Sequence, residues 1–210
     1  MDEARPEEAE TLRLLEEVRA GDRRALDRLL TGHRAYLRTA VELRLDRRLR
    51  ARLDPSDVVQ EAQLEAARRI DDYLRREPMP FHLWLRQTAY QNMLRLRRQH
   101  VEADRRSVTR ELPLPEGSSA LLARQLLGAG PTPSEQAGEE EMARRLRQAV
   151  AELPDTDREI LLMRNFEGLS NQEVAQVLGL EPAAASRRYG RAILRLRKVL
   201  RDGGVMGSEP

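Results

Sequence analysis

The sequence SNQEVAQVLG, residues 170–179, contains the signals of one short helix and of a sharp turn after it. Ser170 and Glu173 have the spacing of a capping box, in which each side chain satisfies a free backbone donor at the start of a helix. Gly179 predicts the end of that helix, because glycine tolerates a left-handed backbone without steric cost. Ala175 is small enough to let a second helix approach. The stretch therefore predicts the first helix of a helix-turn-helix.

The residues after the turn predict the second helix of this motif. Pro182 suits the first helical position, where its missing N–H costs nothing, and the helix should run to about Leu200. From Glu181 to Arg201, six arginines and one lysine face a single acid. A charge run more often marks a solvated helix face, but a helix-turn-helix precedes this one. Early residues could reach base edges and later ones phosphates. We therefore expect five residues to bind duplex DNA: Ser186, Arg187, Arg188, Arg191 and Arg195.

Two further helices are expected before the motif. Apolar residues between Met142 and Leu153 recur at helical spacing, and Pro154 should stop that helix. Thr156-Asp157-Arg158-Glu159 repeats the capping-box pattern. Thr156 is thus predicted to cap a helix that ends near Asn165.

Helical spacing also runs through the N-terminal half. It predicts helices over residues 22–41, 54–76 and 81–99. Asp22 and Asp54 are expected as N-caps, with Pro55 at the first position of the second helix. No segment alternates as a strand does, so the predicted fold is all-α.

Charge is distributed unevenly along the chain. Residues 54–77 hold seven acids and four arginines, whereas residues 84–110 hold seven arginines and two acids. Residues 111–141 hold six glutamates, one arginine, four prolines and four glycines, a composition typical of a linker. We therefore predict two small helical domains joined by a flexible linker, with the helix-turn-helix in the C-terminal one.

Composition excludes several classes of protein. The 210 residues carry a net charge of +2 and only 3% aromatics, so the core must be aliphatic and a β-sandwich is disfavoured. There is no cysteine, which fits a reducing, cytoplasmic location. The acidic N-terminus lacks a leader pattern, and no window has the length of a membrane span. Three scattered histidines and no glycine-rich phosphate loop argue against an enzyme, a metal or a cofactor.

Two central segments allow two interpretations each. Trp84, Tyr90 and His100 interleave with arginines, as in surfaces that stack single-stranded bases, although Phe81 and Trp84 are more often core residues in a chain so poor in aromatics. Acidic and amide side chains at helical spacing in residues 54–77 fit either solvent or the docking of a basic partner. These side chains are Asp57, Gln60, Glu61 and Glu65.

The order of these parts resembles the bacterial extracytoplasmic-function (ECF) sigma factors of RNA polymerase. The resemblance covers about residues 22–201. It rests on Asp54-Pro55-Ser56-Asp57-Val58-Val59-Gln60-Glu61, on Phe81-His82-Leu83-Trp84-Leu85-Arg86-Gln87, and on Leu153-Pro154 followed by Asp157-Arg158-Glu159. The closing string from Ala184 to Ala192 and Arg105-Arg106-Ser107-Val108 resemble the planctomycete-type subgroup.

This resemblance implies a sigma factor that binds core RNA polymerase and directs promoter recognition, with no catalysis of its own. Residues 1–21 would be an N-terminal extension and residues 22–110 a region 2-like domain. Residues 111–138 would be the linker, residues 139–201 a region 4-like domain and residues 202–210 a tail. Asp57, Gln60 and Glu61 would be the docking residues that contact polymerase, and the closing helix would bind the minus-thirty-five element. Four residues would contact the minus-ten element: Arg95, Arg97, Arg98 and His100.

The resemblance suggests one further partner, and the residues leave one main alternative function open. Family members are often held inactive by an anti-sigma protein, which makes such a protein a candidate partner. The chain departs from the commonest pattern at Ala89-Tyr90-Gln91 and at Ser186-Arg187-Arg188, so the resemblance does not carry over a promoter sequence. The main alternative is a non-sigma helix-turn-helix regulator, which would leave the acidic helix followed by an aromatic-basic one without a role.

Overall fold

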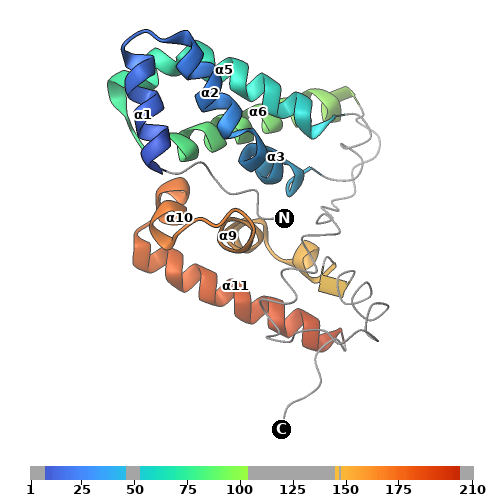
Figure 1. The fold of residues 1–210 in the computed structure, drawn as a ribbon. Coiled ribbons are helices and arrows are strands. Elements are labelled where there is room, and N and C mark those ends of the chain that lie inside the picture. The colour runs from blue at the N-terminus through green and yellow to red at the C-terminus, as the bar shows by residue number, and fades with distance from the viewer. Residues whose placement is uncertain (1–7, 46–52, 104–144, 147, 204–210) are drawn as a thin grey trace, which may run out of the picture. The chain divides into compact units, whose positions relative to one another are not determined.

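The computed structural model describes residues 8–45, 53–103, 145–146 and 148–203, with side chains of 99–103 not described. The chain divides into two compact units, Met1–Arg110 and Glu111–Pro210, and each is described by itself. Every regular element among the described residues is a helix (Figure 1), which confirms the all-α prediction. The predicted linker, residues 111–138, lies outside the described part.

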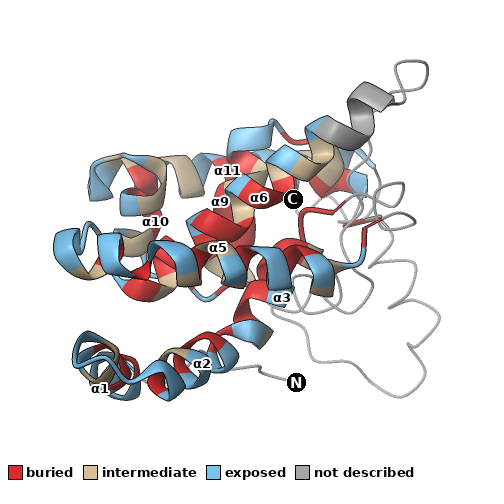
Figure 2. Cartoon of the chain, turned by 90° about the horizontal axis from the view of Figure 1, so that it is seen from above, coloured by how far each residue is buried: buried red, intermediate tan, exposed pale blue. Residues whose placement is uncertain are grey.

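Five helices make up the described part of unit 1. They are α1 (Glu8–Arg19), α2 (Arg23–Gly32), α3 (Arg34–Glu42), α5 (Pro55–Arg76) and α6 (Phe81–Ala103). The long helices α5 and α6 lie side by side, α3 packs on both, and α1 packs on α2 (Figure 1). In Figure 2, α5 and α6 each carry buried residues beside exposed ones, as expected of amphipathic helices around one core.

The predicted helix starts of unit 1 are confirmed. The side chain of Asp22 accepts the N–H of Arg24 at 2.8 Å, and that of Asp54 accepts the N–H of Ser56 at 2.7 Å. Pro55 occupies the first turn of α5. Each of these bonds joins residues two apart, so local sequence suffices to form it.

The single helix predicted over residues 22–41 is wrong, because the chain breaks at His33. Gly32, which has a low helix propensity, ends α2, and α3 begins at Arg34. The His33 ring is only 1% exposed, lies within hydrogen-bond distance of the Leu29 carbonyl at 2.9 Å and meets Phe81 edge-on at 5.2 Å. Burial of this ring in the core accompanies the change of direction.

An aromatic cluster forms the centre of unit 1. Trp84 is 7% exposed, and its ring lies 4.8 Å from Tyr73 and 5.7 Å from Phe81. Phe81 is 3% exposed. The core interpretation of Phe81 and Trp84 is therefore confirmed, and Trp84 is not available to stack on a nucleic-acid base.

Helix α1 contributes to the same core, although the sequence suggested only an extension over residues 1–21. Leu14 and Leu15 are buried in the cluster that contains the aromatic rings. Arg19, in the last turn of α1, forms an ion pair with Glu77, the residue that ends α5. The N-terminal helix is thus an integral part of unit 1.

Tyr73 predicts how the stability of unit 1 responds to alkali. Its hydroxyl donates to the Met79 carbonyl at 3.1 Å, and burial, aided by the Glu77 carboxylate, raises the pKa of Tyr73 from 10.0 to about 12. Because the pKa of Tyr73 is higher in the folded chain than in the unfolded chain, the neutral hydroxyl stabilises unit 1. This contribution is complete below pH 10 and is lost as the pH rises through 12. Between these limits the wild type should lose about 2 kcal/mol more unfolding free energy than Tyr73→Phe. Denaturant titrations at both ends of the window measure this difference, and equal losses would contradict it.

Unit 2 contains α9 (Asp155–Asn165), α10 (Asn171–Leu178) and α11 (Pro182–Asp202), preceded by helical residues 148–152. The capping box at the start of α10 is confirmed. The Glu173 N–H donates to Ser170 Oγ at 3.2 Å, and the Ser170 N–H donates to Glu173 Oε2 at 2.6 Å. Gly179 ends α10 with φ 62°, in the left-handed region as predicted.

The second predicted capping box, at Thr156, is wrong. Helix α9 begins at Asp155, Pro154 is its N-cap, and no side chain caps it. The Pro154 carbonyl accepts the N–H groups of Asp157 and Arg158 at 2.9 and 3.0 Å. Thr156 therefore lies inside the first turn, where its side chain cannot act as the cap.

Candidate nucleic-acid interface

The turn between α10 and α11 is held by hydrogen bonds from both helices. The Leu180 N–H donates to the Ala175 carbonyl at 2.8 Å. The Asn171 side chain, at the start of α10, donates to the Pro182 carbonyl, at the start of α11, at 2.8 Å. Ala175 and Ala185 are both buried, which fits the expectation that small residues allow close approach of the two helices. Hydrogen bonds therefore fix the two helices of the helix-turn-helix relative to each other.

Helix α11 has one packed face and one basic face. Four small or aliphatic residues are buried, and they recur at helical spacing: Ala185, Ala192, Leu196 and Leu200. Ser186, Arg187 and Arg191 are exposed on other faces, whereas Arg188 is half-buried. Further along, three more cations are exposed: Arg197, Lys198 and Arg201. We call the set Arg187, Arg191, Lys198 and Arg201 the basic stripe, because their spacing places them along one side of the helix.

Leu194 lies within the basic stripe and was missed by sequence reasoning. Its side chain is 65% exposed, the largest exposure among the exposed large hydrophobic residues of the described part. It follows Arg191 by three residues and precedes Lys198 by four, and this spacing was the signal. An exposed leucine between cations can make apolar contact with a thymine methyl group or a sugar.

Arg195, one of the predicted DNA contacts on α11, has a partner within unit 2. Its guanidinium forms an ion pair with Asp157 of α9, whose side chain is only 5% exposed. The Arg195 side chain itself is 55% exposed. The ion pair of Arg195 with Asp157 thus joins α11 to α9 within unit 2.

A second polar contact joins α9 to α11. The Tyr189 hydroxyl donates to Asn165 Oδ1 at 3.1 Å. The Arg164 guanidinium lies 5.6 Å from the centre of the Tyr189 ring and also donates to the Leu169 carbonyl at 2.6 Å. These contacts hold the middle of α11 against the end of α9.

The predicted minus-ten contacts lie on α6. Arg95 donates to Glu61 Oε2 of α5 at 3.0 Å and to Asn92 Oδ1 at 3.2 Å. Arg98 is exposed and Arg97 half-buried. The side chain of His100 lies outside the described residues, as do the side chains of residues 104–110.

The predicted docking residues lie on the outer face of α5. Asp57, Gln60 and Glu61 are all exposed and share that face by helical spacing. Leu64 continues it and is 54% exposed, so the face contains an apolar residue that sequence reasoning missed. Glu61 links this face to α6 through Arg95, so the structure brings together two residues that were predicted to meet different partners.

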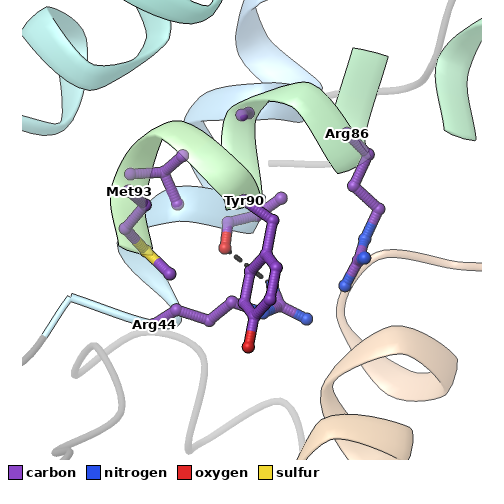
Figure 3. Close-up of a pocket in the computed structure, with 7 residues that line it drawn as sticks. Arg44, Arg86, Tyr90 and Met93 are labelled. Carbon is purple, nitrogen blue, oxygen red and sulfur yellow. Dashed lines mark hydrogen bonds between the residues drawn. The ribbon is translucent and has the colours of Figure 1, made fainter. Parts of the chain in front are cut away.

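One face of the Tyr90 ring is covered, so the ring cannot stack on a base from both sides. The Arg44 guanidinium lies over its ring, 5.9 Å from the ring centre, and donates to the Ala40 carbonyl at 2.7 Å (Figure 3). Arg86 and Met93 line the small pocket beside these residues (Figure 3). Its volume of about 10 Å³ is too small for an organic ligand.

The described residues contain neither a cluster suited to a metal ion nor a helix suited to a membrane. No group of three or more histidine, aspartate or glutamate side chains there is arranged to hold a metal ion. None of the described helices combines the length and apolar character that crossing a membrane requires.

Comparison with known proteins adds to this geometry. Residues 143–196, which include the helix-turn-helix, match the family described as Sigma-70, region 4. Over 194 residues the chain is 32% identical to the probable RNA polymerase sigma factor RfaY of Xanthomonas campestris pv. campestris. That match covers 91% of this chain and 45% of RfaY, so the chain spans about half the length of this curated relative.

Two solved structures have a similar fold. The structure of CnrH in complex with the cytosolic domain of CnrY matches with a TM-score of 0.55 and 22% identity, over 90% of this chain and 96% of that chain. The structure of the sigma factor RpoE in complex with the anti-sigma factor NepR, from Bartonella quintana, matches with a TM-score of 0.50 and 17% identity, over 82% and 91%. At these identities the likeness concerns the fold.

Proposed function

We propose that this chain is a sigma factor of the ECF type, which binds core RNA polymerase and directs promoter recognition and transcription initiation. One observation carries the proposal: α10, the turn and most of α11, with Arg187 and Arg191 of the basic stripe, lie inside the segment that matches Sigma-70, region 4. The 32% identity to RfaY along most of the chain supports it. The protein would act in the cytoplasm without catalysis of its own.

In this proposal, residues 139–201 bind the minus-thirty-five element as duplex. The early residues of α11, Ser186 to Arg191, would enter the major groove, where arginine bonds guanine with two hydrogen bonds. The later cations of the basic stripe would meet phosphates, since they lie further from the start of the helix. The string from Ala184 to Ala192 supports the planctomycete-type subgroup as the finer assignment.

Residues 22–110 would bind polymerase and the minus-ten element. The exposed acidic face of α5, extended by Leu64, suits a basic partner that also makes an apolar contact at one end of the face. Arg97 and Arg98 of α6 would contact the melted strand, and Arg95 would do so once it leaves Glu61. An anti-sigma protein is a further candidate partner, because the similar RpoE structure holds one.

Run-off transcription tests the proposal. Purified bacterial core polymerase and a pool of genomic fragments from the source organism are incubated with and without this protein. We expect specific transcripts that require the protein. Absence of transcripts together with salt-sensitive binding to duplex DNA would instead support the non-sigma helix-turn-helix regulator.

Two arginines of α11 should affect DNA binding in different ways. Arg188→Ala is expected to change the preference between minus-thirty-five sequences, with about 1–3 kcal/mol of discrimination lost at one base pair. Arg197→Ala should weaken binding to all sequences alike and lower the slope of log K against log salt by about 1. Fluorescence anisotropy with a set of single-base variants of the duplex separates the two effects. A uniform loss in both variants would contradict the division into base and phosphate contacts.

A further inference from the structure

The ion pair between Asp157 and Arg195 has no role in the function proposed above. Asp157 lies in the first turn of α9, and its carboxylate is almost fully removed from solvent. Arg195 lies two turns beyond Arg188 on α11. A buried carboxylate needs a charged or hydrogen-bonding partner, because leaving it without one is costly. Contact of Arg195 with a DNA phosphate would draw it away from that partner.

The packing of α11 explains why such a contact matters for orientation. The buried residues of this helix are two alanines and two leucines. Side chains of this kind bury apolar area without directional bonds, so they constrain rotation of the helix about its own axis weakly. Polar contacts have a required geometry and can fix that rotation.

Two polar anchors hold α11 against α9. Tyr189 bonds Asn165, and Arg195 pairs with Asp157. Six residues separate Tyr189 from Arg195, which places them about 120° apart around the helix, on either side of buried Ala192. Tyr189 lies among the buried residues of α11 by this spacing and Arg195 lies to one side of them, so the two anchors hold the helix at two different angles around its axis.

We propose that Asp157 is a positioning residue for DNA recognition, which acts through Arg195 to fix the rotation of α11 and so aim Arg188 and Arg191 at base edges. Arg195 is accordingly a structural partner of Asp157 and not a phosphate contact. This inference rests on the proposed DNA-binding function of α11. It replaces the role that the sequence suggested for Arg195.

The test uses the full chain and a duplex that the wild-type protein enriches from a random pool. Three variants are compared with the wild type: Asp157→Asn, Arg195→Gln, and the double variant that carries both changes. The double variant places two amides where the ion pair was, so a hydrogen bond can form without either charge. Helical content at the temperature of the assay confirms that each variant is folded. Lys198→Ala, an exposed cation of the basic stripe, is the matched control for a phosphate contact.

Two quantities are measured: the ratio of affinities for the enriched and a scrambled duplex, and the slope of log K against log salt. Each single variant should lower the ratio about tenfold with the slope unchanged, and the double variant should recover most of the ratio. Lys198→Ala should instead lower the slope by about 1 and leave the ratio unchanged. The salt slope of a folded protein is not moved by a loss of stability alone.

Other results would overturn the positioning role. A double variant whose slope falls by about 1 would make Arg195 a phosphate contact. A ratio that stays at the wild-type value in the folded single variants would show that the ion pair only stabilises the unit. Failure of the wild type to enrich any duplex would count against the proposed DNA-binding function itself, which is a different outcome.

Discussion

The Asp57→Arg variant will give no protein-dependent transcripts in the run-off reaction, and its affinity for core polymerase will fall about 100-fold, equivalent to about 2.7 kcal/mol. Asp57 is exposed on the outer face of α5 and makes no packing contribution to the core. Reversal of its charge therefore acts on a basic partner more than on the fold. Replacement of an acid by a cation in the first turn of the helix should cost unit 1 at most about 2 kcal/mol.

A matched control separates this effect from a general effect of charge. Asp71→Arg makes the same reversal on the same helix at another exposed position, fourteen residues away and outside the docking residues. We expect it to keep both transcripts and polymerase affinity. Retention of polymerase binding by Asp57→Arg, with native helical content, would place the docking face elsewhere.

Trp84→Ala will destabilise unit 1 by about 3–5 kcal/mol, the range for removal of a buried aromatic side chain from a core. The indole ring packs against both Tyr73 and Phe81, which also contact each other, so its loss leaves a cavity in the aromatic cluster. Urea denaturation followed by circular dichroism measures the change, because Trp84 is the one tryptophan of the chain and its fluorescence disappears with it.

Trp84→Phe is the companion variant for this prediction. It keeps an apolar ring in the cluster and should cost less than half as much stability as Trp84→Ala. If Trp84→Ala leaves stability within about 1 kcal/mol of the wild type and instead weakens binding to single-stranded DNA, the stacking interpretation would replace the core interpretation.

The two capping-box patterns show what local sequence can predict. Ser170 with Glu173 and Thr156 with Glu159 have the same spacing, yet only the first forms a reciprocal box at a helix start. In the second, α9 begins earlier, and the residue after Thr156 is buried in an ion pair with α11. The spacing alone does not contain that long-range contact.

Features that depend on near neighbours along the chain were predictable. Caps at Asp22, Asp54 and Ser170 join atoms within three residues, and the left-handed turn at Gly179 needs only the absence of a side chain. The all-α class, the helix-turn-helix and the excess of arginine on its second helix follow from the same local information. They require no knowledge of the partner helices.

The choice of partner for each charged or aromatic side chain required the folded chain. Arg95 meets Glu61 across 34 residues, and Arg195 meets Asp157 across 38. In the sequence each arginine stands in a run of basic residues, and nothing local sets it apart from its neighbours. Which cations face solvent and which face a carboxylate depends on which helices pack together and how they cross, and burial of apolar area throughout each unit decides that.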